Sequence, residues 1–488
     1  MSNNKISLKM NFFMNALLTM SSFLFQLITF PYITRVLLPV GTGKIAFATS
    51  LISYFSLISQ MGIPTYGIRI CARMREDKYE LSKVVHELLL INIIMCILTY
   101  FIFGLVLTFI PQIQKEKKLY IIISSTILFN AIGMEWLYKG LEQYKYITIR
   151  SIIFKLIALI LMFALVHSKK DYLIYGTISV FAASASNIMN FIHVRKFIYF
   201  KPLGNYNIKK HIKPILIFLA MSCATNIYTN LDSVMLGFMK TETDVGYYDA
   251  AVKVKRILVS IVTSLGAVLL PRASLFIQKK DFLQFNKICS KALKFVFTVS
   301  LPLIIYFILF SYPGIILLSG SAYKGAVIPM IIIMPTLLLI GLTNIMGLQM
   351  LVPLGQEKIV LYSEIAGVIV DCVINMLMIP HFASSGASFG TLIAELVVLL
   401  IQLFFLKERV IPLFKDIKYN VLVAAIVAAS ILSAPIMFLK LDNLLTIILS
   451  SIIFFGVYTK ILFIFKEPII MEIINTIKKY INNFIRKE

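Results

Sequence analysis

Charged and hydroxyl side chains recur at helical spacing within an otherwise apolar stretch near residues 247–276. The residues that fall three or four positions apart there, and so share one helix face, are Asp249, Lys253, Arg256, Ser260 and Thr263. Lys255 lies beside them, and such a cationic face suits an anionic headgroup such as a phosphate. The alternative is an Asp249–Lys253 ion pair near the helix end, with lysines reaching toward the membrane surface. Arg256 lies deeper in the helix, where that alternative accommodates it less well.

Acidic and amide side chains in three other apolar stretches could bind a cation. Asp232 lies in one stretch, Asp371 and Asn375 share a helix face in a second, and Thr391 and Glu395 share a face in a third. Their oxygen atoms are hard ligands, so these residues predict a coupling site for Na⁺ or H⁺. The alternative is a salt bridge from one of the acids to a basic residue, and the candidates for that role are Lys155, Lys253 and Arg256.

Two uncharged polar stripes mark the first two apolar stretches. The first stripe is Asn15, Thr19, Ser22, Gln26 and Thr29, and the second is Thr49, Ser53, Ser56 and Gln60. Such stripes either hydrogen-bond neighbouring helices or line a cavity. Pro31 is expected to break the regular hydrogen-bond ladder of the first helix, Arg35 follows at its outer end, and Lys44 opens the second helix. Tyr248 could stack on a sugar ring, or it could anchor the helix at the membrane interface.

The composition requires a membrane around these stretches. Of 488 residues, 59% are hydrophobic and 14% are charged, whereas soluble domains have about 25% charged residues. Spans of ~20 apolar residues predict an all-α membrane protein with about 14 transmembrane helices. The predicted spans are 11–38, 41–63, 84–110, 119–138, 151–167, 171–194, 214–238, 247–276, 295–312, 327–353, 359–380, 386–406, 419–439 and 443–465.

The net charge of +24 is explained by topology. With the first residues inside and the spans alternating, most of the 47 lysines and arginines fall in cytoplasmic segments, as the positive-inside rule requires. This distribution predicts two cytoplasmic termini and contact with anionic lipids, without nucleic acid. The first apolar stretch is too long for a cleavable signal peptide and lacks a cleavage site. The five cysteines have no CxxC spacing and predict neither disulfides nor metal sites.

An internal repeat divides the chain. Gly43 matches Gly246 and Gly62 matches Gly266, in the same order along the sequence. These matches predict that helices 7–12 repeat helices 1–6 in the same orientation, with substrate between the halves. The expected domains are lobes at 1–200 and 201–410, an appended helix pair at 411–466, and an amphipathic cytoplasmic tail at 467–488.

Sequence motifs for catalysis are absent. The chain contains no Walker A, HExxH or GxSxG motif. The predicted outer loops are too short to build a glycosyltransferase or polymerase site. The sequence therefore predicts a protein that is not an enzyme and that has no cofactor other than a coupling ion.

Several short motifs resemble one known family. They are Pro31-Tyr32-Ile33-Thr34-Arg35-Val36-Leu37, Gly246-Tyr247-Tyr248, Pro353-Leu354-Gly355-Gln356-Glu357-Lys358 and Asn375-Met376-Leu377-Met378-Ile379-Pro380. Through them, nearly the whole chain resembles the Wzx-type polysaccharide flippases of the multidrug/oligosaccharidyl-lipid/polysaccharide (MOP) exporter superfamily.

The resemblance implies two six-helix lobes in a V, with helices 1, 2, 7 and 8 lining the cavity. It implies alternating-access export of undecaprenyl-diphosphate-linked oligosaccharide across the bacterial inner membrane, for O-antigen, capsule or a related polysaccharide. A polysaccharide polymerase and chain-length proteins are the implied partners. The residues implied to meet the diphosphate are Arg35, Lys44, Lys253, Lys255 and Arg256. Those implied to form a Na⁺ site are Asp232, Asp371, Asn375 and Thr391.

Three alternatives stay open. A lipid II flippase and a cation-coupled multidrug antiporter share the expected fold, although an antiporter for cationic drugs would need acids rather than bases in its cavity. The third is a membrane polymerase or glycosyltransferase acting on the same lipid.

Overall fold

The computed structural model describes residues 8–415 and 417–472. All regular secondary structure in this part of the chain is helical, which confirms the predicted all-α class. Most of the predicted amphipathic tail, residues 473–488, lies outside the described residues.

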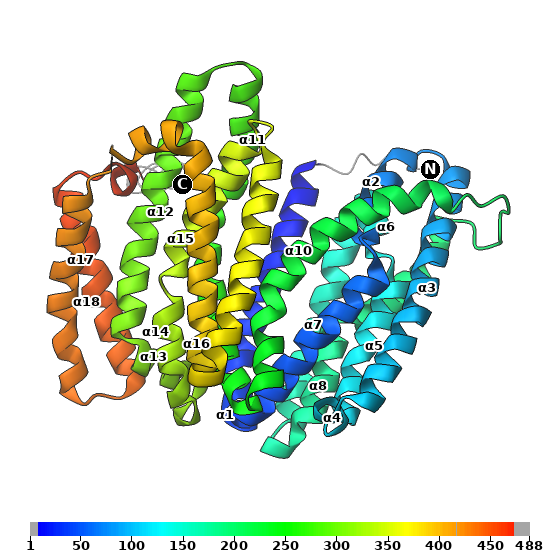
Figure 1. Cartoon of the computed structure of the whole chain (residues 1–488), viewed down its shortest axis with the longest axis horizontal. Coiled ribbons are helices and arrows are strands. Elements are labelled where there is room, and N and C mark those ends of the chain that lie inside the picture. The colour runs from blue at the N-terminus through cyan, green and yellow to red at the C-terminus, as the bar shows by residue number, and fades with distance from the viewer. Residues whose placement is uncertain (1–7, 416, 473–488) are drawn as a thin grey trace, which may run out of the picture. The chain divides into compact units, whose positions relative to one another are not determined.

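The chain forms two compact units, residues 1–246 and 247–488. The helices of the first unit are α1 (Leu8–Gln60), α2 (Ile63–Met74), α3 (Lys78–Phe109), α4 (Pro111–Gln114), α5 (Lys117–Gly133), α6 (Glu135–Gly140), α7 (Tyr144–Leu165), η1 (Lys169–Asp171), α8 (Tyr172–Val180), η2 (Phe181–Ala185), α9 (Ser186–His193), η3 (Val194–Lys196) and α10 (Lys209–Met239) (Figure 1). α11 (Glu242–Gln278) begins in the first unit and continues into the second. The remaining helices are α12 (Phe282–Leu309), α13 (Ser311–Ser319), η4 (Ser321–Ala326), α14 (Val327–Ile333), α15 (Thr336–Asn344), η5 (Ile345–Leu351), α16 (Glu357–Lys415), α17 (Tyr419–Ser433), η6 (Ala434–Leu439) and α18 (Asn443–Ile464).

Two helices are too long for a single membrane crossing, and each is broken by a kink. α1 has 53 residues and α16 has 59, and at 1.5 Å per residue each exceeds ~75 Å. Leu38 (φ 60°) breaks α1 and Ala383 (φ 47°) breaks α16. Figure 1 shows that both parts of each helix extend from the kink toward the same end of their unit, so the chain reverses its direction at the kink. α1 continues through Pro31 to Leu38, so the first part of α1 ends where the predicted span 11–38 ends.

The described residues contain nine helices that are long and apolar enough to cross a membrane, or ten if the bent pair Ser321–Ile333 and Thr336–Leu351 is one span. The chain is thus a multi-pass membrane protein. Each kinked helix covers two of the predicted spans. The total of about 14 spans stays a prediction.

α10 packs with the first unit through a buried polar cluster. The carboxylate of Glu87 on α3 contacts Lys210 Nζ at 2.8 Å and His211 Nε2 at 2.7 Å, and it accepts a hydrogen bond from the Asn207 backbone N–H at 2.7 Å. His211 Nδ1 lies 2.8 Å from the Tyr66 hydroxyl on α2. These contacts hold the start of α10 against α2 and α3. The predicted division into lobes 1–200 and 201–410, with 411–466 appended, stays a prediction beside the observed units.

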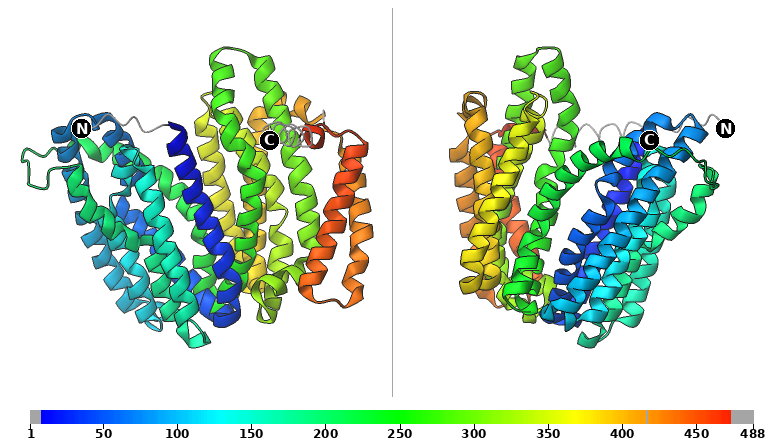
Figure 2. Two further views of the ribbon diagram at one scale, coloured as in Figure 1. Left: turned by 180° about the vertical axis from the view of Figure 1, so that it is seen from behind. Right: turned by 45° about the vertical axis from the view of Figure 1, so that its right-hand side comes forward.

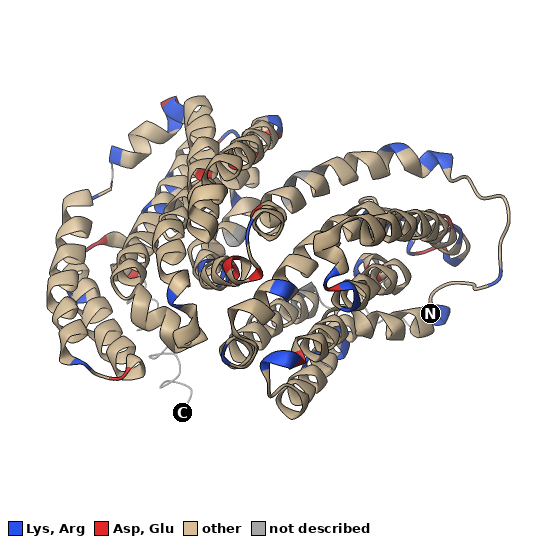
Figure 3. Cartoon of the chain, turned by 60° about the horizontal axis from the view of Figure 1, so that its bottom comes forward, with Lys and Arg blue, Asp and Glu red and all other residues tan. Residues whose placement is uncertain are grey.

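The second unit has two apolar cores. One lies between α11, α12, η5 and α16, and includes the fully buried Phe285, Leu293 and Met350. The other joins α12 to α17 and α18, around Phe454 and Tyr306. α17 and α18 lie side by side in Figure 1 and in both views of Figure 2. Across the chain, the Lys, Arg, Asp and Glu positions gather mainly at helix ends and connections (Figure 3).

Gly43 and Gly246, matched in the internal repeat, meet in the first unit. A Cβ on Gly43 would lie 1.7 Å from the Glu242 carbonyl oxygen, and a Cβ on Gly246 would lie 2.2 Å from the Pro39 carbonyl oxygen. In both cases the carbonyl belongs to the residue four positions before the matched glycine. The contact between these two segments is therefore reciprocal.

We expect Gly43→Ala to destabilise the protein by about 1–3 kcal/mol, because its Cβ would overlap the backbone. Thermal unfolding of the purified protein in detergent measures this as a lower Tm. Gly104→Ala on α3 is the matched control, since a Cβ there would meet nothing within 4 Å. Equal Tm values for the two variants would contradict the close approach.

Candidate functional site

A cavity of about 390 Å³ opens inside the first unit. It lies between the second part of α1, α5, α8 with η2, and α10. None of its lining residues is charged, and nine of them are polar: Thr49, Ser53, Ser56, Gln60, Thr126, Asn130, Ser179, Ser222 and Asn226. The second predicted polar stripe lines this cavity.

The polar cavity residues are partly bonded to one another. Ser53 Oγ donates to Asn226 Oδ1 at 3.1 Å, which joins α1 to α10. Gln60 Nε2 donates to Ser56 Oγ at 2.8 Å along the same face of α1. Sequence reasoning missed the cavity residues of α5 and α8, although the signal was present as a run of small polar residues within an apolar helix.

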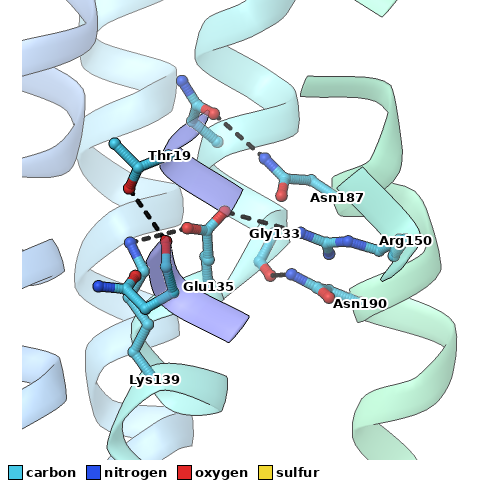
Figure 4. A network of polar contacts seen from close by, with 9 residues as sticks. Thr19, Gly133, Glu135, Lys139, Arg150, Asn187 and Asn190 are labelled. Atoms are coloured by element: carbon cyan, nitrogen blue, oxygen red, sulfur yellow. Dashed lines mark hydrogen bonds and ion pairs between the residues drawn. The ribbon is translucent and has the colours of Figure 1, made fainter. Parts of the chain in front are cut away.

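A polar network continues from the cavity into the helix bundle (Figure 4). Asn187 on α9 donates to Asn130 Oδ1, which belongs to the cavity wall, at 3.2 Å. Farther along, Glu135 contacts Lys139 Nζ at 2.8 Å and the buried Arg150 at 3.6 Å. Figure 4 shows Arg150 on α7 pointing toward Glu135. The basic groups of this network are therefore held next to an acid rather than in the cavity wall.

The first polar stripe is largely exposed. Asn15, Thr19 and Gln26 are exposed along α1, and Thr19 Oγ1 donates to the Asn15 carbonyl at 3.0 Å. Ser22 Oγ receives a hydrogen bond from Lys155 Nζ at 2.6 Å. Lys155 therefore reaches a serine on α1, and its predicted ion pair with an acid of the coupling site is not among the contacts of the described residues.

The two predicted cations of the first unit differ in their surroundings. Arg35 is exposed, and its Nη1 donates to the Pro31 carbonyl at 2.7 Å. Lys44 contacts Glu116 Oε1 at 2.5 Å and lies 4.8 Å from the centre of the Tyr172 ring, and the Tyr172 hydroxyl donates to the same carboxylate. In this conformation Glu116 neutralises Lys44. Sequence reasoning missed Glu116, which lies in a short connection 72 residues from Lys44.

The cationic face of α11 contains an ion pair and an exposed guanidinium. Lys253 Nζ lies 2.6 Å from Asp249 Oδ2, so the predicted local pairing is confirmed for these two residues. Lys255 is half-buried and Arg256 is exposed. Among the described residues Arg256 makes no ion pair, so its charge is available to an anion.

The predicted coupling residues of the second unit come together on the two parts of α16. Asp371 and Asn375 are 2% and 0% exposed, and Asn375 Nδ2 donates to Asp371 Oδ1 at 3.2 Å. Gly390 permits this approach, because a Cβ there would lie 2.3 Å from Asn375 Oδ1 and 3.0 Å from Asp371 Oδ1. Thr391 and Glu395 follow on the same helix face, and both are buried.

Tyr248 belongs to this cluster. Its side chain is 4% exposed, and its hydroxyl lies 3.1 Å from Thr391 Oγ1. A ring buried in this way cannot stack on a sugar or anchor the helix at a membrane surface in this conformation. The sugar contact of Tyr248 stays a prediction, and in this conformation the tyrosine is a neighbour of the candidate ion site.

The donor chemistry of the α16 cluster fits Na⁺. A carboxylate, an amide oxygen and a hydroxyl are hard oxygen ligands, and Asp371, Asn375 and Thr391 supply one of each. No group of three or more His, Cys, Asp or Glu side chains suited to a metal ion occurs in the described residues, which leaves no comparable site for a transition metal. Asp232 is buried on α10 in the first unit, and its predicted share in the ion site stays a prediction.

Two known proteins have sequences that are similar to this one over most of its length. A protein named "Putative O-antigen transporter" in Escherichia coli (strain K12) is 23% identical over 424 residues, which are 84% of this chain and 99% of that protein. Its counterpart of the same name in Shigella dysenteriae is 25% identical over 408 residues, which are 81% of this chain and 99% of that protein.

Two solved structures share the fold. The lipid II flippase MurJ in an inward closed conformation matches 93% of this chain and 100% of its own, with a TM-score of 0.69 and 17% identity. An inward-facing multidrug resistance MATE family transporter of the MOP superfamily matches 83% of this chain and 99% of its own, with a TM-score of 0.56 and 14% identity. At these identities the likeness shows the fold alone.

The sequence profile of the family described as "Polysaccharide biosynthesis protein" matches residues 8–276, which is more than half of the chain. The relatives and the fold are those of membrane transporters and flippases, as the resemblance to the MOP exporters predicted. The chain therefore belongs to the polysaccharide biosynthesis protein family.

Proposed function

We propose that this protein moves an undecaprenyl-diphosphate-linked oligosaccharide from the inner to the outer leaflet of the bacterial cytoplasmic membrane by alternating access. The observation that carries the proposal is the exposed Arg256, part way along an apolar helix of membrane-spanning length. A charge at this depth is costly in lipid, so a guanidinium kept there implies an anionic partner. A diphosphate is such a partner, and Arg binds phosphate oxygens in a bidentate manner.

A lipid with a charged headgroup needs a transporter to cross the bilayer. The diphosphate cannot cross hydrocarbon alone, whereas the polyprenyl tail can stay in the bilayer beside an open groove. A membrane potential that is negative inside favours outward movement of the anion by ~2.3 kcal/mol per charge per 100 mV. The substrate is thus bound and carried rather than altered, and the chain needs no catalytic group.

We propose that both termini face the cytoplasm. α2 and the connection that precedes α10 lie at the same end of the first unit (Figure 1). Basic residues are frequent at this end, among them Arg69 and Arg73 on α2 and Lys209 and Lys210 at the start of α10. The positive-inside rule assigns this end to the cytoplasm. The same residues would contact anionic lipids, and no nucleic acid is needed to explain the charge.

The other candidate functions fit the site less well. A cation-coupled drug antiporter would need acids facing its cavity, whereas the cavity of the first unit has an uncharged wall. A lipid II flippase would use the same cationic face, so the substrate test below includes this lipid. A polysaccharide polymerase and chain-length proteins are the partners expected downstream of the translocated unit.

Removing Arg256 should impair transport. We expect Arg256→Ala to lower the initial rate of translocation of a fluorescent undecaprenyl-diphosphate oligosaccharide in proteoliposomes by roughly 10-fold or more, because a charge-assisted hydrogen bond of about 1.5–3 kcal/mol is lost. Arg256→Lys should retain part of the rate, because the charge stays while the bidentate geometry is lost.

Arg272→Ala is the matched control, because Arg272 is also an exposed arginine on α11 but is not part of the cationic face. If the protein transports lipid II in preference to the oligosaccharide lipid, its function is that of a lipid II flippase. Export of cationic dyes, without transport of any lipid-linked sugar, would overturn the proposal.

We propose that Na⁺ or H⁺ drives the cycle through the α16 cluster. Asp371 and Asn375 are hydrogen-bonded to each other and approach Gly390, the residue before Thr391, and all of these side chains are buried. Glu395 adds a second carboxylate on the helix face of Thr391. A buried carboxylate is stabilised by a bound cation or by a proton. Binding at one end of the membrane and release at the other would couple the ion gradient to the conformational change.

Asp371→Asn should uncouple the rate of translocation from the ion gradient. We expect a Na⁺ or pH gradient to accelerate translocation by the wild type, and we expect the variant to lose this acceleration, because the amide has no negative charge to balance the cation and cannot take up the proton. The measurement compares proteoliposomes with each gradient and with none. Glu408→Gln, on an exposed residue of the same helix, is the control. A variant that keeps the full gradient dependence would rule out Asp371 as the coupling group.

A further inference from the structure

We infer that the cavity of the first unit is a recognition site for a neutral sugar, at which the oligosaccharide of the substrate is held apart from its diphosphate. The inference rests on the proposed function for its source of sugar. It assigns the uncharged part of the substrate to α1, α5, α8 and α10, and leaves the anionic part to the cationic residues.

The wall chemistry excludes ionic ligands. Among the described residues that line the cavity, none is acidic or basic. An anion such as diphosphate, or a cationic drug, would lose its hydration there without gaining a counter-charge, which is strongly unfavourable. A neutral ligand rich in hydroxyl groups loses only hydrogen bonds that the wall can replace.

The wall offers hydrogen-bond donors. Asn226 Oδ1 already accepts from Ser53 and Asn230, each at 3.1 Å, and Asn130 Oδ1 accepts from Asn187. The carboxamide orientation of both residues is thereby fixed. Their Nδ2 groups have no partner among the described residues, so each amide can donate to a ligand.

The wall also offers acceptors. Thr126 Oγ1 donates to the Ile123 carbonyl at 2.7 Å, which leaves its lone pairs available. Gln60 donates to Ser56 through Nε2, and its Oε1 is an acceptor on the opposite side of the amide. A sugar hydroxyl donates one hydrogen bond and accepts others, so it needs a wall of this mixed kind. Phosphate would need donors alone, and a metal ion acceptors alone.

The remaining wall and the size fit a sugar ring as well. Ile52 and Ile123 supply apolar surface for the C–H faces of a pyranose. The volume of about 390 Å³ lies within the range of small-molecule sites, roughly 300–1,000 Å³. A cavity of this size accommodates only part of a longer oligosaccharide, so the site would bind one or two of its sugar units.

The test separates sugar recognition from lipid transport. The probe is the soluble oligosaccharide released by mild acid from the lipid-linked intermediates of the host strain, and its binding to the purified full-length protein is measured by calorimetry. We expect Thr126→Val to weaken binding by roughly 2- to 10-fold, since it removes one neutral hydrogen bond. Ser222→Phe should abolish binding by filling the cavity.

Thr177→Val is the matched control. Thr177 lies on α8 of the same unit, and its hydroxyl likewise donates to a carbonyl of its own helix, but its side chain is exposed away from the cavity lining. Translocation of undecaprenyl diphosphate without sugar is measured in parallel for each variant, as a readout that does not depend on the sugar, and Thr177→Val should leave it unchanged.

Two results would overturn the inference: no binding of the soluble oligosaccharide by the wild type, or equal weakening by Thr126→Val and Thr177→Val. Loss of transport of the sugar-free lipid in the cavity variants would also overturn it, because the cavity would then serve the fold or the diphosphate. If the wild type binds the soluble sugar but moves no lipid, the proposed function fails while the sugar site stands.

Discussion

The requirement that every backbone N–H and C=O inside a bilayer be bonded within the protein determines this structure. It restricts a chain with 59% hydrophobic residues to helices, and it makes any departure from helical geometry costly. Two of the departures are the chain reversals at Leu38 in α1 and Ala383 in α16. These two reversals also create the functional groupings, because each folds two parts of one helix into the same unit. The second part of α1 lines the cavity, and the two parts of α16 bring Asp371 and Asn375 to Gly390 and Thr391.

The helical class and the reversals at residues 38–41 and 380–386 could be predicted, since apolar length and interruption are local properties of the sequence. Pro31 lies inside the first part of α1, within the predicted span 11–38. A proline lacks an N–H but can be tolerated in a membrane helix where neighbouring groups compensate. The packing of α10 with the first unit was beyond the sequence, because Glu87 meets His211 across 124 positions. A single acid in an apolar stretch does not identify its partner.

In the candidate site, too, some contacts could be predicted from the sequence and others could not. Spacing along one helix predicted the Asp249–Lys253 pair and the Asp371–Asn375 pair, because residues four apart on a helix are neighbours. Contacts between helices could not be predicted. Lys44 was expected to face the substrate and is neutralised by Glu116, and Tyr248 was expected at a surface and is buried beside Thr391. Helix periodicity gives the face of a residue but not the helix that covers it.

The separation of charge from the neutral cavity has a consequence for a transporter. Neutral hydrogen bonds contribute about 0.5–1.5 kcal/mol each, so a hydroxyl- and amide-lined wall can distinguish one sugar from another without holding it too tightly to release. Charges contribute more, and here they are paired or placed outside the cavity: Lys44 with Glu116, Arg150 with Glu135, and Lys253 with Asp249. A paired cation can exchange its carboxylate for a diphosphate and recover it afterwards, which keeps the cost of an uncompensated charge low throughout the cycle. Arg256, exposed and without an acidic partner among the described residues, is then the cation best suited to make first contact with the anion.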